Sequence, residues 1–190
     1  MALLLGLSAF SQVRGGVILT IDISNPEAVI FSATGAFAEN DDIDDTFLSE
    51  GFTLLDFFNS EFTDDPQFFD ESSLYSPGGN FAYTTLFPVA IFGDEIDLNI
   101  AGSGFSTQDF STEAPAFTGY AIIDLTSWLP YITAGTTGNI LAGDPMYNTV
   151  VIGQYEVVPE PGTFSLLGGA ALLMIFFCLR TRLARIRQAD

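Results

Sequence analysis

The sequence predicts a mostly β protein, with a single antiparallel β-sandwich or jelly-roll-like domain followed by a C-terminal transmembrane helix. Two observations lead to this prediction. Short apolar segments, some with alternating side chains, recur along residues 17–157 and are separated by Gly, Ser, Asn and Pro. A longer apolar run without any charge then follows near the C-terminus, at residues 163–179.

The first two predicted strands form a hairpin. Residues 17–24 are largely apolar and alternate in their second half, and Asn25-Pro26 ends them before a second stretch at residues 28–34. Further strands are predicted at residues 82–92, 95–101, 117–125 and 149–157. Turn residues separate them at 76–80, 102–104, 135–139 and 143–145. Pro88 indicates an edge strand or a break, because proline cannot donate a ladder hydrogen bond.

Residues 39–75 depart from this pattern. They combine many acidic residues with seven phenylalanines: Phe47, Phe52, Phe57, Phe58, Phe62, Phe68 and Phe69. Leu54, Leu55 and Phe58 fit one face of a helix, but a short strand or a loop fits them as well. Most of these rings are expected to pack in the core. A platform of rings that stacks on sugars is the functional alternative.

The charge distribution limits the partners of this protein. The net charge is −19, and the stretch from residue 15 to 158 contains no Lys, Arg or His. No salt bridge between side chains can form there, so solvent, salt or bound cations must relieve the repulsion. Nucleic acid and anionic lipid are therefore poor partners for this surface, and no binding of nucleic acid is expected. Cysteine is also absent from these residues, so the domain uses no disulfide.

The same composition removes most catalytic machinery. Without His there is no Ser-His-Asp triad or Cys-His dyad, and without Lys there is no Schiff base or P-loop. Only chemistry based on carboxylates remains, such as glycoside hydrolysis by two paired acids. The sequence therefore predicts a protein that is not an enzyme, with a weak glycosidase as the alternative. Trp128 and the six tyrosines are a sparse supply of rings for sugar stacking.

One acidic stretch suggests a calcium site. Residues 39–45 are dense in carboxylate and amide oxygens, which are the ligands that Ca²⁺ prefers. The stretch lacks the glycine and the final glutamate of an EF-hand loop, since these positions hold Thr46 and Phe52. An exposed acidic turn is the explanation that we favour, with a calcium site as the alternative. If calcium does bind, the expected ligands are Asp41, Asp42, Asp44 and Asp45, and no other cofactor is expected.

The C-terminal tail has three parts. Pro159 and Pro161 enclose Glu160 and hold the chain extended, as suits a linker or a segment that an enzyme must thread. The uncharged residues 163–179 reach roughly 25 Å as a helix, the short end of a membrane span. Four arginines then follow, at Arg180, Arg182, Arg185 and Arg187. They predict a cytoplasmic C-terminus, because positive residues are retained on that side of the membrane.

This tail, residues 158–190, resembles a PEP-CTERM sorting signal, and Pro159, Glu160 and Pro161 match its motif. The resemblance implies a substrate of an exosortase, a membrane-embedded cysteine transpeptidase of Gram-negative bacteria. It also implies that the protein is anchored in the inner membrane before processing and then reaches the cell surface or the extracellular space. Proteins with such tails occur in bacteria that make extracellular polysaccharide and form biofilms.

Residues 1–16 are interpreted as a signal peptide. Residues 1–10 are apolar, and Ala9-Phe10-Ser11 offers a small-x-small cleavage pattern. No Lys or Arg precedes the leucines, so we expect the true start to lie upstream. The interpretation gives an acidic ectodomain at residues 17–157. We expect it to have a structural or adhesive role in an extracellular polymer, with a carbohydrate-binding module as the alternative.

Overall fold

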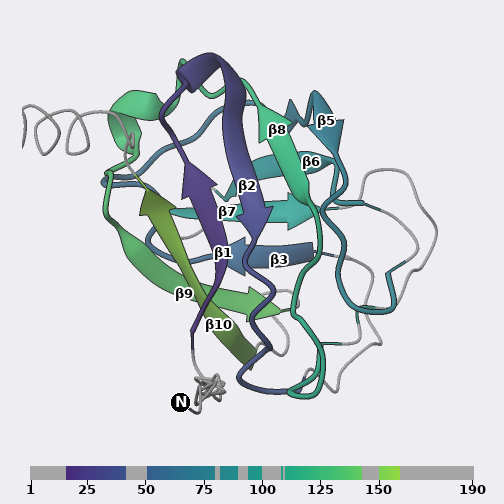
Figure 1. The fold of residues 1–190 in the computed structure, drawn as a ribbon. Helices are drawn as coiled ribbons and strands as arrows, with labels where there is room; N and C mark the ends of the chain where they lie inside the picture. The colour runs from purple at the N-terminus through teal and green to yellow at the C-terminus, as the bar shows by residue number, and fades with distance from the viewer. Residues whose placement is uncertain are drawn as a thin grey trace, which may run out of the picture. The chain divides into compact units, whose positions relative to one another are not determined.

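The computed structural model describes residues 16–41, 51–79, 82–89, 94–99, 108, 110–142 and 150–158. The chain divides into two units, Met1–Val158 and Pro159–Asp190, and every described residue lies in the first. The described strands are β1 (Val17–Asp22), β2 (Val29–Ala33), β3 (Gly51–Leu54), β4 (Gln67–Phe68), β5 (Glu71–Ser72), β6 (Thr85–Val89), β7 (Glu95–Asn99), β8 (Tyr120–Ile123), β9 (Thr137–Ala142) and β10 (Val150–Val158). Two short 3-10 turns, η1 (Pro26–Ala28) and η2 (Leu129–Tyr131), complete them (Figure 1). The prediction of a mostly β domain is confirmed.

These strands form one sheet with the order β4-β6-β7-β3-β9-β10-β1-β2-β8-β5. The predicted hairpin is confirmed, since β1 and β2 pair antiparallel across η1. The prediction of purely antiparallel pairing is wrong at one place, because β1 pairs with β10 in parallel. The two strands come from opposite ends of the described chain, so a long connection rather than a hairpin joins them. Figure 1 shows their arrows side by side and pointing the same way.

The sheet bends where β1 and β10 break their alternation. Ile18 and Leu19 are adjacent in sequence yet both fully buried, and the register with β10 shifts between Val17 and Leu19. On β10 the register with β9 shifts between Val151 and Gly153. A Cβ on Gly153 would lie only 2.8 Å from Cδ1 of Ile18, so this glycine lets the two bulges pack against each other.

Curling brings the two halves of the sheet face to face. In Figure 1 the strands β3, β6 and β7 run crosswise to β1, β2 and β8. Their inward side chains form one apolar core, in which the rings of Phe52 on β3 and Phe117 before β8 lie 4.6 Å apart. The interior is rich in aromatic rings, which is why an acidic chain without disulfides has enough apolar surface to bury.

Residues 67–75, which we call the closing segment, join the two ends of the sheet. β4 and β5 stand at opposite ends of the strand order, yet only Phe69 and Asp70 separate them along the chain. The N–H of Phe69 donates to the carbonyl of Thr84 beside β6, and the N–H of Asp70 donates to Ile122 on β8, both at 2.9 Å. The sheet therefore returns on itself, because one short stretch of chain contributes both of its end strands.

Two differences from the sequence prediction concern strands. β9 begins at Thr137, inside the turn that the sequence predicts at residues 135–139. β3 lies in residues 39–75, for which the sequence did not distinguish helix, strand and loop. At Pro88, β6 pairs with Ile96 of β7, whereas the two residues of β4 pair only with Leu86 and Thr85. Among the described strands Pro88 is thus at an edge position, as its missing N–H requires.

Candidate functional site

The sequence-predicted sorting residues lie outside the described part of the chain. Pro159, Glu160 and Pro161 belong to this group, as do Arg180, Arg182, Arg185 and Arg187. The predicted signal peptide falls outside it as well, except for residue 16. A search of the described residues finds no helix with the length and apolar character needed to cross a membrane. These assignments stay predictions.

Of the four predicted calcium ligands, only Asp41 is described; Asp42, Asp44 and Asp45 lie outside the described residues. The backbone N–H of Thr112 donates to Oδ1 of Asp41 at 2.7 Å, so a backbone amide already holds one oxygen of this carboxylate. Within the ranges that the structure describes, no three acidic, Cys or His side chains are placed to hold a metal ion. The calcium site remains a prediction.

The candidate sugar-stacking residue Trp128 lies in the core. Its side chain is fully buried, with ring contacts to Phe58 and Phe62 at 6.0 and 5.5 Å. Its indole Nε1 donates to Oδ2 of Asp64 at 2.7 Å, which satisfies the only polar group of the ring. Trp128 therefore anchors the aromatic segment and presents no ring face to a ligand in this structure.

Two other aromatic rings point outward from one face of the sheet. Phe68 on β4 is 66% exposed and Phe87 on β6 is 38% exposed. Phe68 pairs with Thr85, which lies two residues from Phe87, so all three side chains are on the same face. The opposite face carries Leu86, which is fully buried in the core. The two rings are thus diagonal neighbours on the solvent side, within reach of each other.

Carboxylates continue this face onto β7. Asp97 pairs directly with Phe87, and Glu95 pairs with Val89, while Ile96 and Leu98 between them face the core. Thr53 on β3 donates from Oγ1 to Oδ1 of Asp97 at 2.5 Å. We call Phe68, Phe87, Glu95 and Asp97 the β6–β7 outer face; Thr85 has the same orientation but is fully buried.

Glu95 has an unusual environment within this face. Its Oε2 atom is buried and accepts no hydrogen bond. Partial burial raises the pKa of Glu95, and the neighbouring charges of Asp94, Asp97 and Asp56 raise it further. Ionisation of Glu95 therefore opposes folding: its contribution to stability is complete below its unfolded pKa of 4.5 and is lost as the pH rises through its higher folded pKa.

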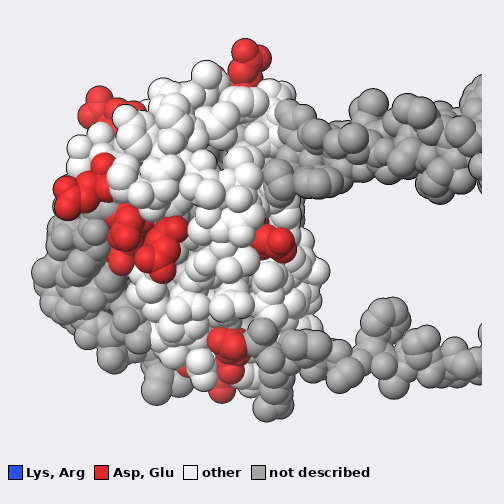
Figure 2. Space-filling view, turned by 90° about the vertical axis from the view of Figure 1, so that its left-hand side faces the viewer, with Lys and Arg blue, Asp and Glu red and all other residues white. Residues whose placement is uncertain are grey.

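No positive side chain balances these acids anywhere from residue 15 to 158. Figure 2 shows separate groups of Asp and Glu on one face of the molecule, with no Lys or Arg among the coloured atoms. The outer face can therefore accept hydrogen bonds and cationic groups, and it offers no positive side chain that would hold an anion.

The acidic residues also affect a buried phenol. Burial, together with Asp56 and Asp94, raises the pKa of Tyr155, whose hydroxyl donates to the carbonyl of Leu55 at 2.7 Å.

Sequence reasoning missed this face for a physical reason. The residues from Thr85 to Val89 read as a nearly continuous apolar run, which hides the alternation of Leu86 inward and Phe87 outward. The stretch Glu95–Asn99 alternates cleanly, so its outward carboxylates could have been predicted.

The chain was compared with known proteins. No protein-family model matches it, and neither the curated proteins nor the solved structures contain a match.

Proposed function

We propose that this chain is an exported surface or extracellular-matrix protein of a Gram-negative bacterium, sorted by an exosortase through its C-terminal tail. The single observation that carries the proposal is the tail sequence. A Pro-Glu-Pro motif at Pro159–Pro161 precedes the uncharged residues 163–179 and then four arginines. Each element alone is common, but their order and spacing at residues 158–190 together match a sorting signal.

In this proposal residues 163–179 form a transmembrane helix that holds the protein in the inner membrane before processing. The arginines stay on the cytoplasmic side, where they also meet anionic lipid. The curled sheet is then a jelly-roll-like sandwich on the outer side of that membrane. After processing, the domain resides at the cell surface or in an exopolysaccharide or biofilm matrix, with a structural or adhesive role.

Two properties of the described domain agree with an extracellular structural role. Its carboxylates are not neutralised by any side chain, so the surface stays strongly hydrated. The sheet ends in β4 and β5, which are only two residues long, and such short end strands are poor templates for unwanted strand pairing.

A second candidate function is that of a carbohydrate-binding module or a carboxylate-based glycosidase. The specific observation in its favour is the β6–β7 outer face, where the exposed rings of Phe68 and Phe87 lie beside the carboxylates of Glu95 and Asp97. Aromatic rings stack on the apolar faces of sugars, and carboxylates accept hydrogen bonds from sugar hydroxyls.

The sorting proposal is tested by the intact mass of the protein in the surface fraction of its native host. Processing predicts a chain that ends between Pro159 and Gly162, with or without an added group. A control variant that carries Pro159→Ala and Pro161→Ala should remain unprocessed in the cell membrane fraction. A wild-type chain at the surface that still carries residues 180–190 would instead mean a plain membrane anchor and would overturn the sorting proposal.

A further inference from the structure

We propose that the β6–β7 outer face binds a polysaccharide built from amino sugars with free ammonium groups. The inference deepens the proposed function and rests on it for the location of the protein in an extracellular polymer. It starts from three observations on one sheet face: two outward aromatic rings, the neighbouring carboxylates of Glu95 and Asp97, and the absence of positive side chains.

The aromatic part of the face fits a sugar ring. Phe68 and Phe87 are two of the four large apolar side chains most exposed in the described residues, and they are the two that share a face of neighbouring strands. A pyranose ring presents axial C–H groups on its flat side, and these pack against the face of an aromatic ring. An ammonium group near such a ring gains a further attraction from the ring quadrupole.

The charged part of the face fits an ammonium group. Oε2 of Glu95 is buried and accepts no hydrogen bond, although a carboxylate in such a place normally finds a donor. Asp97 lies on the same face and is paired with Phe87. Oε2 itself has no exposed surface, so an ammonium group would lie beside this carboxylate, where its charge would offset the mutual repulsion of Glu95, Asp94 and Asp97.

The same residues discriminate against other polymers. A uronic-acid polymer would bring carboxylates to a domain that has no positive side chain between residues 15 and 158, so like charges would repel it. A neutral or fully N-acetylated chain could stack on the rings but has no cation for Glu95. Specificity for free amino groups therefore follows from charge, while the rings add affinity for a sugar over a simple cation.

The test measures binding of a glucosamine hexamer to the full chain by calorimetry, in a polyoxyethylene detergent that carries no sugar. The N-acetylglucosamine hexamer, a uronate hexamer and hexalysine serve as comparison probes. Wild-type protein should bind the glucosamine hexamer at least about fivefold more tightly than any of these. The variants Phe68→Ala, Phe87→Ala and Glu95→Gln should each weaken that binding about fivefold. Salt at about 0.5 M should also weaken it, because salt screens the attraction between the ammonium groups and the carboxylates.

Two control variants match the exposure and charge of the test positions. Tyr131→Ala removes a ring that is 37% exposed, close to the exposure of Phe87, on η2 and outside the closing segment. Glu27→Gln removes an exposed carboxylate on η1. Both should bind the glucosamine hexamer as the wild type does. If hexalysine binds as tightly as the amino sugar, or if the controls lose as much affinity as the test variants, attraction is merely electrostatic and the proposal is overturned.

Failure of this experiment would leave the sorting proposal intact, because the intact mass of the surface form does not depend on any ligand. Conversely, a chain that is not processed by an exosortase could still bind the glucosamine hexamer. The two proposals are therefore separated by their readouts.

Discussion

The centre of the sheet and its closing segment are stabilised in different ways. The central strands β9, β10, β1 and β2 have ladders of four to six residue pairs and bury aliphatic and aromatic side chains on alternate positions. The closing segment, residues 67–75, has only two pairs to β6 and two to β8. It is completed by single hydrogen bonds, an isolated bridge between Tyr75 and Thr118, and contacts of its side chains.

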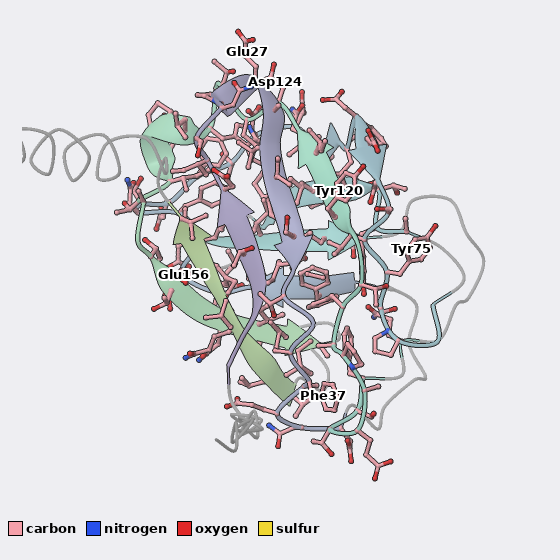
Figure 3. The ribbon with its side chains drawn as sticks, viewed as in Figure 1. Glu27, Phe37, Tyr75, Tyr120, Asp124 and Glu156 are labelled. Atoms are coloured by element: carbon pink, nitrogen blue, oxygen red, sulfur yellow. The ribbon has the colours of Figure 1, made fainter. Side chains whose placement is uncertain are left out.

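This difference shows which strands are held by many contacts and which segment is held by few. In the centre each strand packs against several others, and the apolar patterns of β1, β2 and β10 also help to fix their register. In the closing segment the position of the chain depends on a few close contacts. Figure 3 shows Tyr120 on β8 and Tyr75 in the closing segment on the same side of the molecule, where these contacts lie. Three predictions test this comparison.

The largest expected effect is in the centre. Phe31 on β2 is fully buried, and its ring lies 6.5 Å from that of Phe57 and 5.7 Å from that of Phe69. Phe31→Ala should lower the free energy of unfolding by about 4 kcal/mol, because it removes a large apolar side chain and leaves a cavity. Chemical denaturation followed by circular dichroism measures the change. A loss below about 1 kcal/mol would contradict the assignment of this ring to the core.

An intermediate effect is expected where the closing segment meets β8. Gly119 has φ of 81°, and a Cβ at this position would lie 1.8 Å from the carbonyl oxygen of Ser73. Gly119→Ala should therefore lower the free energy of unfolding by about 3 kcal/mol, through backbone strain and displacement of the closing segment.

Gly35 supplies the matched control for this glycine. Its φ of 77° is nearly the same, but a Cβ there would meet nothing within 4 Å. Gly35→Ala should cost only the backbone strain, about 1 kcal/mol. Hydrogen exchange should show faster opening of residues 67–75 in Gly119→Ala alone. Equal losses in the two variants would mean that the close approach to Ser73 contributes nothing.

The smallest expected effect concerns one exposed hydrogen bond of the closing segment. The hydroxyl of Tyr120 donates to Oε1 of Glu71 at 2.6 Å, and this bond and the charge of Glu71 raise the pKa of Tyr120. The pKa of Tyr120 is therefore higher in the folded protein than the value of 10 in the unfolded chain. Its hydroxyl contributes fully to stability below pH 10, and this contribution is lost as the pH rises through the pKa of the folded state.

Wild type should therefore be slightly more stable than Tyr120→Phe at pH 9, and the difference should shrink at pH 11. Denaturation midpoints of the two proteins at both pH values measure it. The raised pKa of the buried Tyr155 affects both proteins equally and cancels in the comparison. A difference that grows between pH 9 and pH 11 would exclude the Glu71 contact as its source.

The sequence could predict the strands that carry their own pattern. Residues 17–24 and 28–34 alternate enough to define β1, β2 and their hairpin, and Glu95–Asn99 alternates over its whole length. β9 was hidden because Thr137 and Gly138 read as turn residues. Gly138 is in fact required in a strand, since a Cβ there would lie 2.3 Å from the carbonyl oxygen of Leu55 and 2.5 Å from the ring of Tyr155. Such a requirement is tertiary and leaves no local signal.

The candidate site shows the same limit. Phe57, Phe58 and Phe62 are buried, whereas Phe68 is exposed, although all lie in one acidic, phenylalanine-rich segment. Their orientation is decided by pairing with distant residues, such as Phe68 with Thr85 and Phe58 with Ile132. The expectation that most of these rings pack in the core holds for the described ones, but only the register identifies the ring that faces solvent.

The parallel pairing of β1 with β10 has a mechanical consequence. Because the strands run the same way, the first residue of β1 and the last residue of β10 lie at opposite ends of the pair. Val17 begins β1 and pairs with Gln154, whereas Val158 ends β10 and pairs with Asp22. A pulling force applied between residues 17 and 158 would slide the two strands past each other. Their ladder hydrogen bonds would then have to break together rather than one after another. This part of the domain is therefore built to withstand tension along the chain.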